Sequence, residues 1–310
     1  MSDDEQKTQP KVKPRPGRPR KKPLRTAEPK KGIVKNPSND MHFIEFLYDK
    51  PLVFKKLWQF FKLMAVDKIQ INFTKTHIFM WCHDHYKKSH MRVKINCAEV
   101  NHYYCESDHE IGLLCKNPKL VMNTIDKTCN SILFLSTQDN IQKNIQIVLK
   151  NDIDFEEVHK IELIGEFDRS ERGKKFTDEN YAVKFNLPGK YFKKMITDIR
   201  SFSGQATIRQ DGAEEPLTFE YITHDKKIKS LHVAKNSKSI SLRSSLKEDD
   251  TFRTSFKVDY VKPISSALLA EHIEIYADED KPLMFTIQMD DKAIELKILT
   301  DIIDNRNVDI

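Results

Sequence analysis

The segment Cys82–His85, with the sequence CHDH, combines residue types that bind metal ions. Structural zinc sites usually contain two pairs of ligands, with a short and regular spacing within each pair. This segment has no Cys-x-x-Cys spacing and no second pair at a suitable distance. We therefore expect it to form the turn of a β-hairpin, and we expect neither a metal site nor another cofactor.

Other residue types with catalytic potential also lack the required spacing. The stretch HEIGL (109–113) has no second histidine, so it is not the HExxH motif of zinc proteases. No GxxxxGK[ST] loop occurs, and the aspartate pairs 249–250 and 290–291 fall where turns are expected. Because no nucleophile is placed beside a base, we expect a protein without enzymatic activity or a small-molecule substrate.

A basic N-terminal arm is the strongest chemical signal in the sequence. Residues 13–23 read KPRPGRPRKKP, and residues 11–35 carry a net charge of +10, whereas residues 36–310 total −2. The first 40 residues contain no Phe, Tyr or Trp. Such a segment cannot bury enough apolar surface to offset the entropy lost on ordering. We therefore predict a disordered basic arm over residues 1–40.

The arm has three possible roles. Its GRP core resembles an AT-hook, in which arginines enter a narrow A·T minor groove, although Pro16 replaces the usual basic residue. The basic runs also suit a nuclear localisation signal, or a solvated tether that adds nonspecific phosphate contacts. The residues that would contact DNA are Arg15, Gly17, Arg18, Pro19, Arg20, Lys21 and Lys22.

The body behind the arm divides into two halves with a similar pattern. The halves are residues 41–166 and 181–303. Each begins with a strand and a helix containing FKK, and then has short runs of alternating apolar and polar residues and one more helix. Short alternating runs indicate antiparallel strands, and a repeated order of elements indicates duplication. We predict an α+β fold of two similar domains, with a polar linker at 167–180 and a tail at 304–310.

Helices are predicted over residues 50–65, 117–127, 188–202 and 261–268. Apolar residues at helical spacing mark the buried faces of two of them. These residues are Leu57, Phe60, Phe61 and Met64 in the first helix, and Phe192, Met195, Ile196, Ile199 and Phe202 in the third.

Positive charge is concentrated on the other faces of these helices. Helix 50–65 carries four lysines and no acid, helix 188–202 has a net charge of +3, and residues 116–127 have +2. The rest of the body, residues 36–310 without these helices, then has a net charge of about −11. Lysine is a good helix former and is common on any solvated helix face. That preference does not explain why the rest of the body is acidic. Segregated charge of this kind suits a polyanion held at one face through its phosphates.

Cysteine usage and hydropathy limit the cellular setting. The chain has five cysteines, no apolar run behind its basic start, and no stretch of about 18 apolar residues. An odd number of cysteines without an export signal favours reduced thiols in the cytosol or nucleus. We expect a protein that is neither secreted nor inserted in a membrane.

Several segments in the same order resemble the proliferating cell nuclear antigen (PCNA) family, the sliding clamps of DNA replication. They include strand 41–49, the first FKK helix and the run 259–291. The likeness is greatest to the PCNA-like proteins of large nucleocytoplasmic DNA viruses such as African swine fever virus. Further matching segments are YDKPLVFKKLWQFFK (48–62), EVNHYY (99–104), GRPRKK (17–22) and KKGIVKNP (30–37), so the resemblance spans residues 14–302.

The resemblance implies a homotrimeric ring around duplex DNA, with antiparallel sheets outside and basic helices inside. The residues that would line the hole are Lys55, Lys56, Lys62, Lys119, Lys190, Lys193, Lys194 and Arg200. Subunits would join by pairing strand 144–150 with strand 206–210 of the next subunit. The joint would contain Ile145, Ile147, Thr207 and Ile208.

The family also implies partner proteins, namely DNA polymerase and other replication and repair factors, that dock beside the interdomain linker. The matching positions here are His90, Met91, Leu163, Phe167 and Pro282. The linker sequence DRSERGKKF (168–176) is polar and basic where cellular clamps are more apolar. We therefore expect docking peptides of the cellular type to bind weakly.

The implied function is a processivity factor in an infected cell, in a cytoplasmic viral factory, the nucleus or both. Two alternatives remain open at this point. The first is a clamp-like late transcription factor that acts through protein and DNA contacts without a ring. The second is a subunit of a DNA-modifying enzyme.

Overall fold

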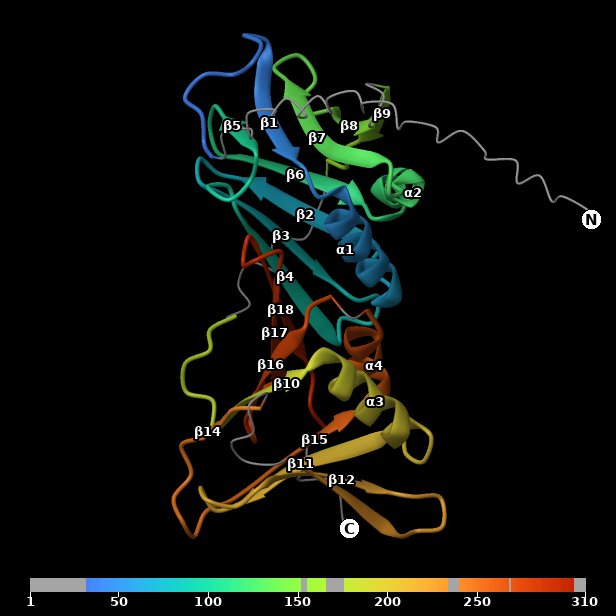
Figure 1. Ribbon diagram of the computed structural model, residues 1–310, viewed down its shortest axis with the longest axis vertical. Helices are drawn as coiled ribbons and strands as arrows, with labels where there is room; N and C mark the ends of the chain where they lie inside the picture. The colour runs from blue at the N-terminus through green and yellow to red at the C-terminus, as the bar shows by residue number, and fades with distance from the viewer. Residues whose placement is uncertain (1–31, 152–154, 166–175, 234–239, 268, 304–310) are drawn as a thin grey trace, which may run out of the picture.

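The computed structural model describes residues 32–151, 155–165, 176–233, 240–267 and 269–303 (Figure 1). The first half of the chain contains nine strands and two helices. They are β1 (His42–Tyr48), α1 (Pro51–Leu63), β2 (Lys68–Phe73), β3 (His77–His83), β4 (Ser89–Asn96), β5 (His102–Cys105), β6 (His109–Leu114), α2 (Lys116–Thr124), β7 (Cys129–Thr137), β8 (Asn144–Asn151) and β9 (Glu156–Glu162).

The second half repeats the same order of elements. They are β10 (Val183–Pro188), α3 (Gly189–Arg200), β11 (Gln205–Asp211), β12 (Leu217–Ile222), β13 (Ile228–Val233), β14 (Leu242–Ser244), β15 (Thr251–Lys257), α4 (Val258–Ala267), β16 (His272–Ala277), β17 (Leu283–Met289) and β18 (Ile294–Thr300). Each half is a strand, a helix, five strands, a helix and three strands. The predicted α+β fold of two similar domains is therefore confirmed.

The strands form three antiparallel sheets, one of which joins the two halves. A five-stranded sheet (β5-β1-β7-β8-β9) belongs to the first half, and a four-stranded sheet (β13-β12-β11-β15) belongs to the second. The third sheet has nine strands, in the order β14-β10-β16-β17-β18-β4-β3-β2-β6. It crosses from one half to the other where β18 pairs with β4, from Ile294 opposite Ile95 to Thr300 opposite Ser89.

Two isolated bridges strengthen the evidence for duplication. After β9, the chain returns so that Ile164 pairs with Gly112 of β6. After β18, Ile303 pairs with Ser255 of β15 in the corresponding way, also antiparallel. Short apolar segments that follow the last strand of each half thus cover equivalent strand edges.

The buried faces of the helices follow the predicted apolar spacing. In α1, Leu57, Phe60 and Phe61 are buried, and Phe54 and Trp58 join them in an aromatic cluster with β1 and β7. In α3 the buried residues are Phe192, Met195, Ile196 and Ile199. The assignment of Phe202 to this stripe is wrong. The helix ends at Arg200, and Phe202 stays 39% exposed with its ring stacked on Tyr221.

The predicted subunit joint is wrong as we placed it. Ile145 and Ile147 lie on β8, which is paired on one side with β7 and on the other with β9. Thr207 and Ile208 lie on β11, which is paired on both sides with β12 and β15. Both strands are interior, so neither has a free edge. The joint was transferred by position from the family resemblance, and that transfer selected the strand next to an edge strand in each sheet.

The last residues assigned to the arm belong to the body. Gly32 and Val34 donate backbone hydrogen bonds to the carbonyls of Val100 and Tyr103, at 3.0 and 2.8 Å, so this segment runs parallel to the edge strand β5. Ser38 then donates from both its N–H and its hydroxyl to Glu45 Oε1, each at 2.7 Å. Residues 1–31 lie outside the described residues.

Glu45 fixes this arm root, residues 32–40, to the first half. Its side chain is almost fully buried, yet it is hydrogen-bonded by Ser38, by His42 Nδ1 at 2.7 Å and by His102 Nε2 at 2.5 Å. Burial by itself raises the pKa of Glu45, but the hydrogen bonds from Ser38, His42 and His102 together outweigh it and lower the pKa. The site therefore stabilises the ionised carboxylate.

We expect Glu45→Gln to lower the free energy of unfolding at pH 7 by about 1–3 kcal/mol, because a buried acceptor of several hydrogen bonds is weakened. Since the folded pKa is depressed, the carboxylate contributes fully above its unfolded pKa, and that contribution is lost as pH falls through the folded pKa. Urea unfolding at several pH values should show the two proteins converging below about pH 4. The exposed Glu99→Gln serves as control, and a constant gap down to pH 3 would contradict the assignment.

Candidate nucleic-acid interface

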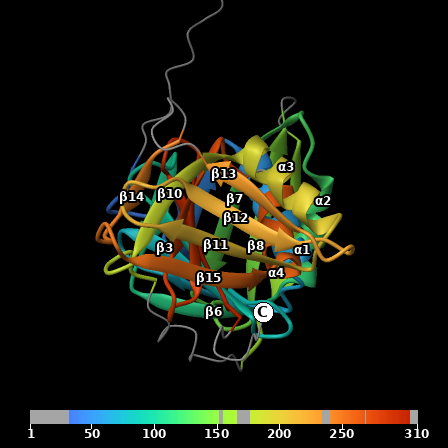
Figure 2. The same ribbon diagram turned by 90° about the horizontal axis from the view of Figure 1, so that it is seen from below.

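The four helices form one row along a single side of the molecule (Figures 1 and 2). Helix α1 packs against α2 and α4, and α4 packs against α3, so the row runs α2-α1-α4-α3 across both halves. The sheets lie behind this row. The cations predicted on separate helices are therefore brought onto one continuous surface.

Most of the predicted cations project from this surface. Lys56 and Lys62 of α1 are exposed on the side opposite the aromatic cluster, and Lys119 of α2 is half-buried. On α3 the exposed lysines are Lys190, Lys193 and Lys194. None of the five exposed lysines forms an ion pair within the part of the chain that the structure describes. Their ammonium groups are thus available to a polyanion.

Two of the predicted cations have other roles. Lys55 donates to the carbonyl of Ile125 at 2.5 Å, just beyond the C-terminus of α2, where lysine satisfies orphan carbonyls. Arg200 forms an ion pair with Asp259 of α4 at 3.2 Å. Their charges therefore stabilise contacts between neighbouring helices, which sequence spacing could not reveal because both partners are distant in sequence.

A third cation links the helix row to the junction of the two halves. Lys50, just before α1, forms an ion pair with Asp290 in the turn between β17 and β18, and Tyr48 donates its hydroxyl to the same carboxylate. Burial and the nearby Asp290 raise the pKa of Tyr48, so the phenol stays protonated. Asp290, Asp291 and Lys292 all have positive φ angles, from 50° to 75°, as the tight turn requires.

The surface suits nonspecific phosphate binding. Lysine ammonium groups are flexible point charges that contact phosphates without reading bases. Apolar side chains also reach this side, since Leu52 and Leu63 of α1, Leu120 of α2 and Tyr191 of α3 are exposed. The predicted DNA contacts of the arm, from Arg15 to Lys22, lie outside the described residues and stay a prediction.

The CHDH segment spans the end of β3 and the start of the hairpin turn that leads to β4, because Cys82 and His83 belong to the strand and Asp84 and His85 follow it. Asp84 Oδ1 accepts backbone hydrogen bonds from Lys88 and Ser89, both at 2.7 Å, and His85 Nδ1 lies 2.7 Å from Asp67 Oδ2. Asp84 therefore has a structural role. Across the described residues, no cluster of three or more His, Cys, Asp or Glu side chains is arranged to hold a metal ion.

The residues of the predicted partner pocket lie in different environments, and the pocket stays a prediction. Met91 is wrongly included, because it pairs with Ile298 in the nine-stranded sheet and its side chain lies in the core. His90 is nearly buried beside Leu299, Leu163 is half-buried, and Pro282 accepts a hydrogen bond from the Tyr181 hydroxyl at 3.0 Å. Phe167 lies outside the described residues.

Phe176 was missed by the sequence analysis. It is the buried linker residue of a small apolar cluster with Tyr276, Met284 and Leu299, which Trp81 and Tyr181 border. The Arg92 guanidinium lies 5.4 Å from its ring centroid, and Lys297 Nζ donates to its carbonyl at 3.3 Å. An aromatic residue within an otherwise polar linker was the available signal for this contact.

Sequence comparison finds viral relatives of similar length. An uncharacterized protein of African swine fever virus is 28% identical over 291 residues in the Namibian warthog isolate and in the Badajoz strain. Each match covers 92% of this chain and 96% of the relative. No protein-family model matches the chain.

Structure comparison finds PCNA clamps. PCNA from Thermococcus kodakaraensis superposes with a TM-score of 0.72 at 16% identity, covering 84% of this chain and all of that one. PCNA from Entamoeba histolytica gives a TM-score of 0.70 at 12% identity, covering 85% and 100%. The chain has the fold of a PCNA clamp, with two PCNA-like domains. Among the described residues, no helix is long and apolar enough to cross a membrane.

We expect the quadruple variant Lys56→Ala, Lys62→Ala, Lys193→Ala and Lys194→Ala to weaken binding to duplex DNA and to reduce its salt dependence. Each lost phosphate contact lowers the slope of log K against log salt by about 0.9, so the slope should fall by about 3–4. Fluorescence anisotropy over a salt series measures this. A matched control replaces Lys68, Lys75, Lys87 and Lys247, which are exposed and lie outside the four helices. Equal losses for both variants would refute the helix surface as the binding face.

Proposed function

We propose that this chain is a DNA sliding clamp that encircles duplex DNA as a homotrimer and tethers DNA polymerase and other replication or repair proteins. The observation that carries the proposal is the continuous row of four helices with unpaired lysines on a clamp fold. A ring retains DNA by topology, so its inner surface needs only weak, screened phosphate contacts that permit sliding. Exposed lysines provide such contacts.

The sheet edges support ring closure at a different place from the one we predicted. Three sheet edges are already covered by a β-bridge. Ile33 bridges to the edge of β5, Ile164 to that of β6 and Ile303 to that of β15. Of the other described strands that end a sheet, β14 has only three residues, whereas β9 and β13 have seven and six. They belong to the sheets at opposite ends of the molecule (Figure 1). A head-to-tail contact between β9 and β13 would remove both edges and close a ring.

The two edges are also complementary in charge. β9 carries Glu156, Glu157 and Glu162, whereas Lys226, Lys227 and Lys229 surround the start of β13. Exposed apolar side chains lie at both edges, with Val158 on one and Ile228 on the other, 54% and 66% exposed. Opposite charges and apolar contacts in a head-to-tail arrangement favour one register and one partner surface.

We expect charge reversal at either edge to break the trimer. One variant carries Glu156→Lys and Glu162→Lys, and the other carries Lys227→Glu and Lys229→Glu. Each should shift the assembly to monomers, because like charges then meet across the joint. A chain with all four changes restores the pairing and should return toward the trimer. Light scattering measures the mass, and a trimer that persists in both single-edge variants would rule out this joint.

The function is tested by topological retention. We expect the wild-type protein to remain on a nicked circular plasmid during gel filtration in high salt, and to be lost when the plasmid is first cut once. Salt screens phosphate contacts but does not open a closed ring. The edge variants provide the control, since they should be lost from both forms. Retention that is insensitive to cutting, or a wild-type monomer, would instead favour the alternative without a ring.

The proposal extends to cellular setting and partners. The viral relatives favour a role in viral replication, in a cytoplasmic factory, the nucleus or both. The basic arm precedes Gly32. The arm root, which is hydrogen-bonded to Glu45 and to the β5 edge, attaches the arm to the first half at a fixed position. Residues 11–35, with a net charge of +10, would add phosphate contacts outside the hole.

A further inference from the structure

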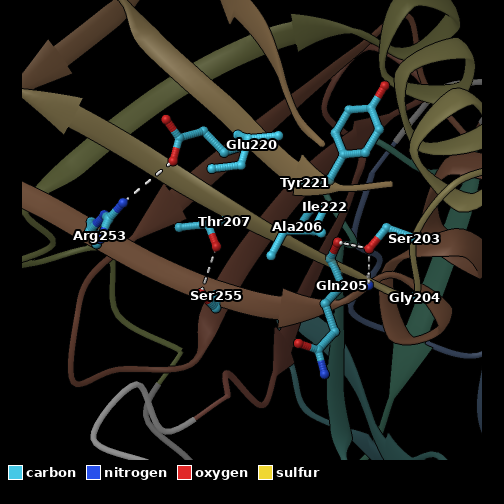
Figure 3. Close-up of a pocket in the computed structure, with 11 residues that line it drawn as sticks. Ser203, Gly204, Gln205, Ala206, Thr207, Glu220, Tyr221, Ile222, Arg253 and Ser255 are labelled. Carbon is cyan, nitrogen blue, oxygen red and sulfur yellow. Dashed lines mark hydrogen bonds and ion pairs between the residues drawn. The ribbon is translucent and has the colours of Figure 1, made fainter. Parts of the chain in front are cut away.

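A hollow lies on the face of the four-stranded sheet that is turned away from the core (Figure 3). Ala206 and Ile208 of β11 point into the core, so Thr207 between them lies on the opposite face. The hollow has a volume of about 490 Å³ and is lined by Thr207, Glu220 and Ser255, with Ile222 and Ile228 at one end. Both isoleucines are exposed, at 48% and 66%.

Three polar residues that line the hollow belong to one row of paired residues across the sheet. Ser255 pairs with Thr207, Thr207 with Glu220, and Glu220 with Ser230. Ile303 extends the row at its β15 end, where its N–H donates to the Ser255 carbonyl at 2.8 Å. The last described residue of the chain therefore lies at the rim of the hollow.

The first half contains the equivalent row. Ile164 pairs with Gly112, Gly112 with Gln70, Gln70 with Trp81, and Trp81 with Arg92. Ile164 thus corresponds to Ile303. In this half the chain continues from Ile164 into the linker and reaches the far end of the row, where the Phe176 ring lies against Arg92 with Trp81 at its border.

We propose that the C-terminal tail, residues 304–310, docks in the hollow of its own chain, with Val308 and Ile310 against Ile222 and Ile228. The duplicated architecture gives the route, because the segment after the first row returns to that row. The tail has the sequence DNRNVDI, in which Val308 and Ile310 are the apolar residues. They match the apolar end of the hollow.

The length of the tail permits this path. Ile303 lies one strand spacing outside β15, so the strand carrying Ile222 is three spacings away from it and the strand carrying Ile228 is four. At about 4.8 Å per spacing, these distances are about 14 and 19 Å. Seven extended residues span up to about 23 Å, so Ile310 reaches the isoleucines when the tail is nearly extended. The inference concerns one chain, but Ile228 also lies at the proposed β13 joint, so cross-links are counted only within one polypeptide.

The test replaces Ile310 with the photo-cross-linker p-benzoylphenylalanine in the full chain. We expect irradiation to join it to residues 203–207 or 220–228 of the same polypeptide, detected by mass spectrometry of peptides at monomer mass. Ile222→Asp combined with Ile228→Asp should reduce the yield at least fivefold. Both positions are exposed, so the variant should fold, and thermal melting by circular dichroism checks this. The control Leu63→Asp changes an equally exposed residue on α1 and should leave the yield unchanged.

Hydrogen exchange gives a second readout without a label. We expect deletion of residues 304–310 to speed amide exchange in 217–233 and not in the equivalent strands of the first half. Cross-links elsewhere on the chain, cross-links only between two chains, or unchanged exchange after the deletion would each overturn the proposal. If a foreign peptide protects 217–233 equally with and without the tail, the hollow is a site for a partner instead.

Discussion

The pairing of β18 with β4 is the contact on which the architecture depends. It joins strands from opposite halves into one nine-stranded sheet, over seven residues from Ile294 to Thr300. A flexible link between two duplicated domains would leave their helices free to point in different directions. The shared sheet instead fixes the halves so that α1 and α4 touch and all four helices fall on one side. The contact of Tyr48 and Lys50 with Asp290 supports the same junction from the helix side.

Control of sheet edges is the second organising constraint. Exposed strand edges invite uncontrolled pairing, so proteins cover or shorten them. Here the arm root pairs with the edge of β5. The segments after β9 and β18 pair with the edges of β6 and β15. Within the described chain, this coverage singles out β9 and β13 as long edges with complementary charge. The same coverage anchors the arm, the linker and the tail, so the irregular segments leave the body at defined points.

The cations divide into two groups with different physical roles. Lys50, Lys55 and Arg200 are paired with carboxylates or helix carbonyls and hold elements together. The exposed lysines of α1 and α3 instead keep their charges on the surface, where solvent screens them. Screened charges contribute little to folding stability, so their concentration on one face is better explained by a partner than by the fold.

The sequence by itself determined the elements, their duplication and the positive helix faces. These follow from local periodicity, because a helix or strand places its side chains at a fixed repeat whatever it packs against. Leu57, Phe61, Met195 and Ile199 were therefore assigned correctly. Only the tertiary structure decided which strands are edges, because an interior strand such as β8 has the same alternation as an edge strand with one buried face. It also decided that Lys55 and Arg200 are engaged, that Met91 lies in the core and that Phe176 is buried. Each of these depends on a neighbour distant in sequence, and local pattern carries no information about such neighbours.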